Sequence, residues 1–291
     1  MGKTIKKGLT IKKKNSITGY LFIAPWLIGF FALTAFPFVY SILLSLHSVQ
    51  LKTSGTVMTW KGWYYFDQAL NVDKNFKLDL MNTVTFIVCA VPVILVFSLI
   101  IAMLLRGKYP LRLFFRAVFF FPVIILSGPV ISQLLTKHTS DFSQSGKEIY
   151  TFLNTMPDII KTPSLFVMDN LVLILWFSGV QILIFLAGLQ KISPEIYEAA
   201  SIDGAGEWEK FWKITLPYMK PMILVAAIYS IVEIANFSNN AVNTSIVAHL
   251  FEVNQPYSFS AAMSWIYFVV VIAVLLVFTL LINGVKREKR I

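Results

Sequence analysis

Six long stretches of apolar residues constrain this chain more than any other feature of its sequence. A helix that rises 1.5 Å per residue needs about 20 such residues to cross the hydrocarbon core of a bilayer. The predicted spans are Tyr20–Leu46, Asn82–Leu105, Ala117–Leu135, Leu171–Gln190, Pro221–Ala241 and Ala261–Gly284. They lack the alternation of barrel strands, so the sequence predicts an all-α integral membrane protein with six transmembrane helices.

The composition supports this class and excludes several others. Hydrophobic residues make up 57% of the 291 residues and charged residues only 14%, whereas a soluble domain has roughly 25% charged residues. Cys89 is the only cysteine, so neither an internal disulfide nor a cysteine-rich metal site can form. The three histidines are scattered along the chain, and we expect this chain to bind no metal and no cofactor.

The basic residues predict the orientation of the spans. Eighteen of the 25 Lys and Arg residues fall in the two tails and in the connections after the second and fourth spans. Cytoplasmic connections are enriched in Lys and Arg, so both termini are expected in the cytoplasm. Anchoring at the membrane surface accounts for the net charge of +10 without a nucleic-acid partner.

The division of the chain follows from this orientation. Residues 1–19 are expected to form a cytoplasmic basic tail, and residues 20–290 a single transmembrane domain. The first apolar stretch lacks a small-residue cleavage site, so we interpret it as a retained membrane helix and not as a signal peptide.

The connection between the fourth and fifth spans, residues 191–221, has the pattern of two short helices joined by a glycine corner. Ser193 and Pro194 suit the cap and the first position of a helix, and Glu195 in the first turn complements the helix dipole. This helix is expected to stop near Gly204, because glycine accepts positive φ without steric cost.

A second helix is expected to carry Trp208, Phe211 and Trp212 on one side. It should end before Pro217, since the residue that precedes a proline avoids helical conformation. On shape alone, the segment also suits an amphipathic hairpin that lies on the lipid headgroups with its aromatic side chains in the membrane.

The residue identities favour a different interpretation. The segment resembles the EAA loop of ABC importer permeases, whose pattern is Glu-Ala-Ala, a glycine four residues after the second alanine, and a later Ile-x-Leu-Pro. The matching residues are Glu198, Ala199, Ala200, Asp203, Gly204, Ala205, Phe211, Ile214, Leu216, Pro217 and Pro221. The resemblance implies a cytoplasmic coupling-helix loop, Glu195 included, that docks on a separate ATPase. Glu198 is then its polar anchor, or else a solvated helix residue.

Further stretches are similar to sugar-importer permeases. They are the opening span with Pro25, Pro37, Tyr40 and Ser41, the pair Asn82-Thr83, and the run YSFSAAMSWIYF from Tyr257. This resemblance implies a compact type I ABC importer permease, multi-pass in a bacterial cell membrane. The implied partners are a second permease subunit, two ATPase subunits that hold ATP and Mg, and an extracytoplasmic solute-binding protein that delivers a carbohydrate. The chain contains no GxxxxGK[ST] phosphate loop, so it is expected to be non-catalytic.

Polar residues inside the predicted spans are the candidates for a translocation pathway, since sugars are bound by hydrogen bonds and aromatic stacking. They are Tyr229, Glu233, Asn236, Asn239, Asn240, Gln181 and Trp176. Four of them recur at steps of four, three and four, which predicts one face of a helix: Tyr229, Glu233, Asn236 and Asn240. Glu233 is the only carboxyl group deep in a predicted span, and such groups usually face a bundle interior. Hydrogen bonding between helices, or pairing of Glu233 with a basic group on the partner subunit, is an equal alternative for this set.

Three other functions remain as alternatives. An ABC permease for a non-sugar solute, such as glycerol phosphate or a polyamine, has the same loop. In an ion-coupled secondary transporter, Glu233 would be a coupling or ion site, although six spans without a visible inverted repeat disfavour this function. A membrane-embedded enzyme has no support, because the sequence contains no metal-ligand cluster and no nucleophile motif.

Overall fold

The computed structural model describes residues 11–52, 55–107, 114, 147–250 and 257–284. Within these ranges the regular structure is helical apart from one two-stranded hairpin, which confirms the all-α class. The chain forms two compact units. The first consists of residues up to 72 together with 248–265, and the second of residues 73–247 together with those from 266 onward.

In the described part of the chain, five helices are long and apolar enough to cross a membrane. They are Thr18–Leu46, Lys74–Arg106, Leu171–Leu189, Glu207–Ala235 and Ser258–Gly284. Each overlaps with one of the six predicted spans, although Glu207–Ala235 begins and ends earlier than the predicted Pro221–Ala241. The remaining prediction, Ala117–Leu135, lies outside the described residues.

The first unit begins with an apolar helix in three segments. These are α1 (Ile11–Phe30), the π-helical turn η1 (Phe31–Ala35) and α2 (Phe36–Leu46). The π turn ends two residues before Pro37. In regular α-helix the ring of Pro37 clashes with the carbonyl of Leu33, and Leu33 lies within the wider turn. The turn therefore lets the apolar helix continue past the proline.

A short hairpin follows α2, and the sequence pattern did not predict it. Its antiparallel strands are β1 (His47–Lys52) and β2 (Gly55–Trp60), and the short helices α3 (Tyr64–Asp67) and η2 (Gln68–Val72) come next. His47 pairs with Trp60, and their rings meet edge to face at 5.0 Å. The N–H of Val49 donates to Ser258 Oγ at 3.0 Å, which ties the hairpin to the first turn of α14 (Ser258–Gly284).

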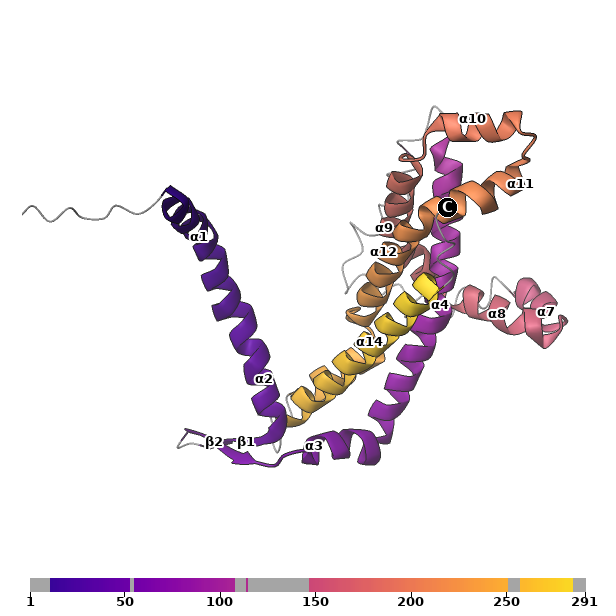
Figure 1. Cartoon of the computed structure of the whole chain (residues 1–291). Coiled ribbons are helices and arrows are strands. Elements are labelled where there is room, and N and C mark those ends of the chain that lie inside the picture. Colours follow the sequence, from indigo (N-terminus) through magenta and orange to yellow (C-terminus); the bar gives the residue numbers. More distant parts are fainter. Residues whose placement is uncertain (1–10, 53–54, 108–113, 115–146, 251–256, 285–291) are drawn as a thin grey trace, which may run out of the picture. The chain divides into compact units, whose positions relative to one another are not determined.

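Three long helices form the centre of the second unit, where α9 and α12 pack against α4 and against each other (Figure 1). Their bounds are α4 (Lys74–Arg106), α9 (Leu171–Leu189) and α12 (Leu216–Ala235). Helix α4 starts eight residues before the predicted Asn82, because Asp73 caps it: Asp73 Oδ1 accepts from the N–H groups of Asn75 and Phe76, both at 3.0 Å. The shorter helices are α7 (Lys147–Asn154), α8 (Asp158–Asp169) and α13 (Ala241–Leu250).

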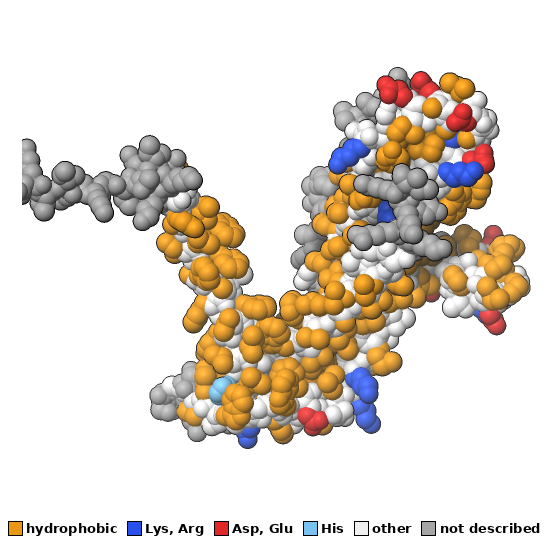
Figure 2. All heavy atoms as spheres, in the orientation of Figure 1, with side chains coloured by type: hydrophobic (Ala, Val, Ile, Leu, Met, Phe, Trp, Pro, Cys, Tyr) orange, Lys and Arg blue, Asp and Glu red, His pale blue; other side chains and the backbone are white. Residues whose placement is uncertain are grey.

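The core of the second unit has two parts along these helices. One contains Ile94, Phe177 and Ile231, and the other, next to residues 191–221, contains Phe185 and Met219. The outward faces of the same helices are apolar, as Figure 2 shows, and side chains such as Val96 and Val225 are exposed. An apolar surface of this extent fits contact with lipid or with another membrane subunit.

Helices α9 and α12 approach each other closely at Gly188. A Cβ atom at this position would lie 2.6 Å from Cγ of Met222 and 3.0 Å from two atoms of Met219. Only glycine fits there without movement of the methionines. The end of α9 is thus fixed on α12 immediately before the chain enters residues 191–221.

Candidate functional site

The first helix of the predicted coupling loop is present as α10 (Pro194–Ile202). It begins at Pro194 and ends at Ile202, with Asp203 as its cap and Gly204 next at a φ of +84°, so both predicted bounds are confirmed. Ser193 stands at the cap position, but its hydroxyl donates to Glu195 Oε2 at 3.3 Å and makes no side-chain bond to the helix backbone. The left-handed glycine turns the chain sharply.

The second helix differs from the prediction. It consists of α11 (Glu207–Lys210) and the π-helical turn η3 (Phe211–Thr215), and it continues directly into α12. The expectation that it ends before Pro217 is wrong. Pro217 is the second residue of α12, and Lys213, four residues earlier, lies in the wide turn and not in regular α-helix. The second helix of the loop and the fifth span are therefore one continuous helical rod.

The outward face of α10 carries small and acidic side chains. Glu195, Glu198 and Ala199 are exposed on it, and Ile202 has 87% of its surface exposed. These positions are separated by three or four residues, so they lie on one side of the helix. Figure 2 shows the acidic side chains gathered over α10. The corner residues Asp203 and Gly204 are exposed next to this face, and Ala205 is half-buried.

The inward face of α10 is attached to the membrane helices. Ile196 and Tyr197 pack on the buried cluster that contains Leu105 and Met219. Phe211, Ile214 and Leu216 of the predicted motif pack on the same cluster. Ala200 is half-buried, and its side chain is a single methyl group. The inward residues of the motif thus anchor the loop, and the outward ones are left for a partner.

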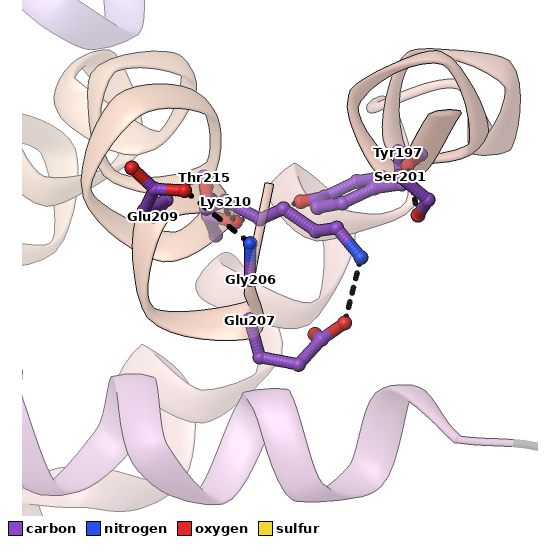
Figure 3. A network of polar contacts seen from close by, with 7 residues as sticks. All are labelled: Tyr197, Ser201, Gly206, Glu207, Glu209, Lys210 and Thr215. Carbon is purple, nitrogen blue, oxygen red and sulfur yellow. Dashed lines mark hydrogen bonds and ion pairs between the residues drawn. The ribbon is translucent and has the colours of Figure 1, made fainter. Parts of the chain in front are cut away.

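Polar contacts fix the base of the loop (Figure 3). The hydroxyl groups of Tyr197 and Thr215 lie 2.8 Å apart, so α10 is bonded to the last residue of η3. Lys210 pairs with Glu207 at 2.8 Å, and Gly206 N–H donates to Glu209 at 3.4 Å. Neither Tyr197 nor Thr215 was singled out from the sequence. The signal available there was an aromatic residue on the side of the helix opposite the acidic positions.

A depression of about 420 Å³ lies between α9 and α12 in the second unit. Its lining consists of Trp176, Phe177, Tyr229, Val232, Glu233, Asn236, Phe237 and Ser238. Four of the candidate pathway residues are therefore brought together, namely Trp176, Tyr229, Glu233 and Asn236. Phe237 and Ser238 were not predicted, because they lie in the turn that follows α12.

Gln181 lies directly behind Glu233. Its side chain is fully buried, and its amide donates to Ser230 Oγ at 2.8 Å and to Glu233 Oε2 at 3.3 Å. Gln181 Oε1 has no hydrogen-bond partner among the described residues. A buried amide with an unused acceptor, next to a carboxyl group that lines the depression, suits a site that receives hydrogen-bonding groups.

Asn240 does not belong to this site, and the prediction of a single helix face that includes it is wrong. Helix α12 ends at Ala235 with Asn236 as its cap, so the helical spacing stops before Asn240. Asn240 instead accepts from Thr83 Oγ1 at 2.9 Å and donates to the hydroxyl of Tyr267 at 3.0 Å. It joins α4 to α14 as a structural link. Asn239 is exposed in the same turn and does not line the depression.

Comparison with known proteins assigns this architecture. Residues 69–287 match the model of the family described as "Binding-protein-dependent transport system inner membrane component". The probable ABC transporter permease protein YesP of Bacillus subtilis (strain 168) is 33% identical over 223 residues, which are 75% of this chain and 70% of that protein. The lactose transport system permease protein LacF of Rhizobium radiobacter is 30% identical over 290 residues, with 92% and 93% covered.

A solved structure agrees with the fold. It is a chain of a bacterial ABC transporter involved in the import of the acidic polysaccharide alginate, with a TM-score of 0.68 and 19% sequence identity. The match covers 94% of this chain and 98% of that chain. The family match extends over most of the sequence and includes α4, α9, α10 and α12. This multi-pass membrane protein therefore belongs to the family of inner membrane components of binding-protein-dependent transport systems.

Proposed function

We propose that this chain is the permease subunit of an ATP-driven importer and that it translocates a sugar or oligosaccharide delivered by an extracytoplasmic binding protein. The observation that carries the proposal is the two-sided construction of α10. Its inward face is packed on the membrane helices, and its outward face presents Glu198, Ala199 and Ile202. A helix anchored in this way can receive a partner and move with the span behind it.

The partner on α10 is a cytoplasmic ATPase subunit. Small residues let its surface approach the helix, and the exposed carboxylates of Glu195, Glu198 and Asp203 favour basic side chains there. Two such ATPase subunits bind ATP and Mg, so this chain is not catalytic. A second permease subunit completes the pathway, and both termini of this chain lie in the cytoplasm.

The substrate contacts the depression between α9 and α12. Trp176 and Tyr229 offer aromatic faces, while Glu233 and Asn236 offer hydrogen bonds, and this combination suits a sugar ring. None of the described residues that line the depression is basic. An anionic solute such as glycerol phosphate meets Glu233 there without a counter-charge, so the depression favours an uncharged sugar.

Copurification tests the role of α10. A tagged chain is purified from its native membranes, and the ATP hydrolysis that copurifies with it is measured. We expect hydrolysis with the wild type and its loss when Glu198→Lys reverses the charge of the outward face. Glu148→Lys is the matched control, because Glu148 is an exposed glutamate on α7. If no ATPase accompanies the wild type, or if an ion gradient alone drives uptake by the isolated chain, the proposal fails.

A further inference from the structure

Three helices of the second unit meet at the side chain of Tyr197. The guanidinium of Arg106, the last residue of α4, lies 4.6 Å from the centroid of the Tyr197 ring. This distance is typical of a cation–π interaction. The Tyr197 hydroxyl lies 2.8 Å from Thr215 Oγ1, at the end of η3 and directly before α12. The ring therefore contacts α4, and the hydroxyl contacts the start of α12.

The hydrogen bonds at this point have a defined direction. Thr215 Oγ1 donates to the carbonyl of Lys210 at 3.4 Å, across the π turn. A threonine hydroxyl has a single hydrogen, so Tyr197 must be the donor to Thr215. The result is a chain of bonds from Tyr197 through Thr215 to the backbone of Lys210 (Figure 3). Thr215 is only 3% exposed, and burial makes these bonds less open to competition from water.

Arg106 extends the same contact to the end of α9. Its guanidinium donates to the carbonyl of Ile192 at 3.5 Å, just after the end of α9. Ile192 and the neighbouring Leu105 are buried in the cluster on which Tyr197 packs. Tyr197 is thus connected to the cytoplasmic ends of α4 and α9 through Arg106, and to α12 through Thr215.

The backbone between α10 and α12 is not stiff enough to couple the two helices without these side-chain contacts. It runs through Gly204, whose φ is +84°, and through Gly206, and a Cβ atom at either position would meet nothing within 4 Å. Two glycines in open space make this corner compliant. A displacement of α10 is therefore transmitted to α12 mainly through side chains, and Tyr197 supplies the direct polar contact.

We propose that Tyr197 is the positioning residue that makes α10 move as one body with α4 and α12, acting through Arg106 and Thr215. This inference rests on the proposed function, in which an ATPase displaces α10. It assigns a mechanical role to the inward side of the loop, whereas the docking role belongs to the outward side. Loss of the hydroxyl contact lets α10 follow the ATPase while α12 lags behind.

Variants that differ by one hydroxyl separate this role from simple core packing. Tyr197→Phe keeps the ring and its contact with Arg106, and Thr215→Val keeps the size of the threonine. Thr215→Ser restores a hydroxyl and should restore the wild-type result. Ser201→Ala is the matched control, because Ser201 lies on α10 but its hydroxyl bonds only within that helix, to the carbonyl of Tyr197.

The measurement is the distance between spin labels on α10 and α12 in the complex with its ATPase, with and without bound ATP. Labels at Pro194→Cys, an exposed position of α10 away from its docking residues, and at the exposed Val225→Cys are introduced after Cys89→Ala removes the native cysteine. We expect the wild type to keep one narrow distance in both states. Tyr197→Phe and Thr215→Val should increase the population of a second distance about fivefold on ATP binding, as the loss of one hydrogen bond predicts.

The outcomes distinguish the two levels of the proposal. If Tyr197→Phe and Thr215→Val retain the narrow wild-type distance with ATP bound, the positioning role is wrong while the importer assignment stands. If the wild-type chain recruits no ATPase, the proposed function fails and this inference fails with it. If Tyr197→Phe does not assemble with the ATPase, the comparison of Thr215→Val with Thr215→Ser tests the positioning role, because neither substitution changes α10.

Discussion

The buried amide of Gln181 on α9 donates to the carboxyl group of Glu233 on α12 at 3.3 Å. This bond fixes the one acidic side chain among the described residues that line the depression. It makes Glu233 both a link between two helices and a group that faces an open space. The two roles have different consequences for a conservative change.

Glu233→Gln should lower sugar uptake by about tenfold and leave assembly with the ATPase unchanged. The reason is that a hydrogen bond to a charged group contributes about 1.5 to 3 kcal/mol, while the amide still fills the same volume. Uptake of a panel of labelled neutral sugars by intact cells, compared with the yield of purified complex, checks this. Glu148→Gln on α7 is the control. Wild-type uptake by Glu233→Gln would assign Glu233 to helix contacts alone.

Asn240→Ala should lower the free energy of unfolding by about 2 to 3 kcal/mol, because it removes the bonds to Thr83 and Tyr267 and leaves the buried hydroxyl of Thr83 without its acceptor. Thermal unfolding in detergent measures the loss. Asn239→Ala, the exposed neighbour, should change stability by less than about 0.5 kcal/mol. Equal effects of the two changes would contradict the assignment of Asn240 as a structural link.

Gly188→Ala should also destabilise the protein, by about 1 to 3 kcal/mol. Alanine is intrinsically better than glycine in a helix by about 1 kcal/mol. The 2.6 Å approach to Met222 Cγ outweighs that gain, because the clash is not with the flexible end of the side chain. Unfolding midpoints of the purified chain decide the sign. A stabilised Gly188→Ala variant would mean that α9 and α12 separate easily.

Gly204→Ala should reduce the copurifying ATPase activity several-fold, because a φ of +84° costs an L-residue about 1 kcal/mol or more and displaces the corner. Gly206→Ala is the matched control, since Gly206 has a φ of −72° and open space around it. If both variants recruit the ATPase like the wild type, the shape of the corner does not matter for docking.

The sequence predicted the parts of this molecule that depend on local chemistry. Hydropathy identified the five spans that lie in the described residues, and Pro194 and Gly204 gave the start and the end of α10. Composition could not show that α12 ends at Ala235, because Asn236 to Asn240 continue the helical spacing by coincidence while the backbone turns. The bond from Asn240 to Thr83 crosses 157 positions in sequence, and no local pattern contains it.

The candidate site shows the same division. The outward residues of α10 were found because they belong to a recognisable motif, and Trp176, Tyr229 and Glu233 because polar and aromatic groups are conspicuous in apolar spans. Tyr197 and Thr215 were missed because their importance lies in their 2.8 Å contact. The hairpin after α2 was missed for a similar reason, since strand pairing between two short segments depends on tertiary contacts such as Val49 to Ser258.

The π turn at Phe211–Thr215 also determines which way the coupling loop faces. A π turn is one extra residue in an α-helix, and each residue of an α-helix advances the chain by about 100° around the axis. Without this extra residue, α11 would be rotated by about that angle relative to α12. The direction in which the loop points around the fifth span is thus set by a single extra residue in the π turn, which comes immediately before Leu216 and Pro217.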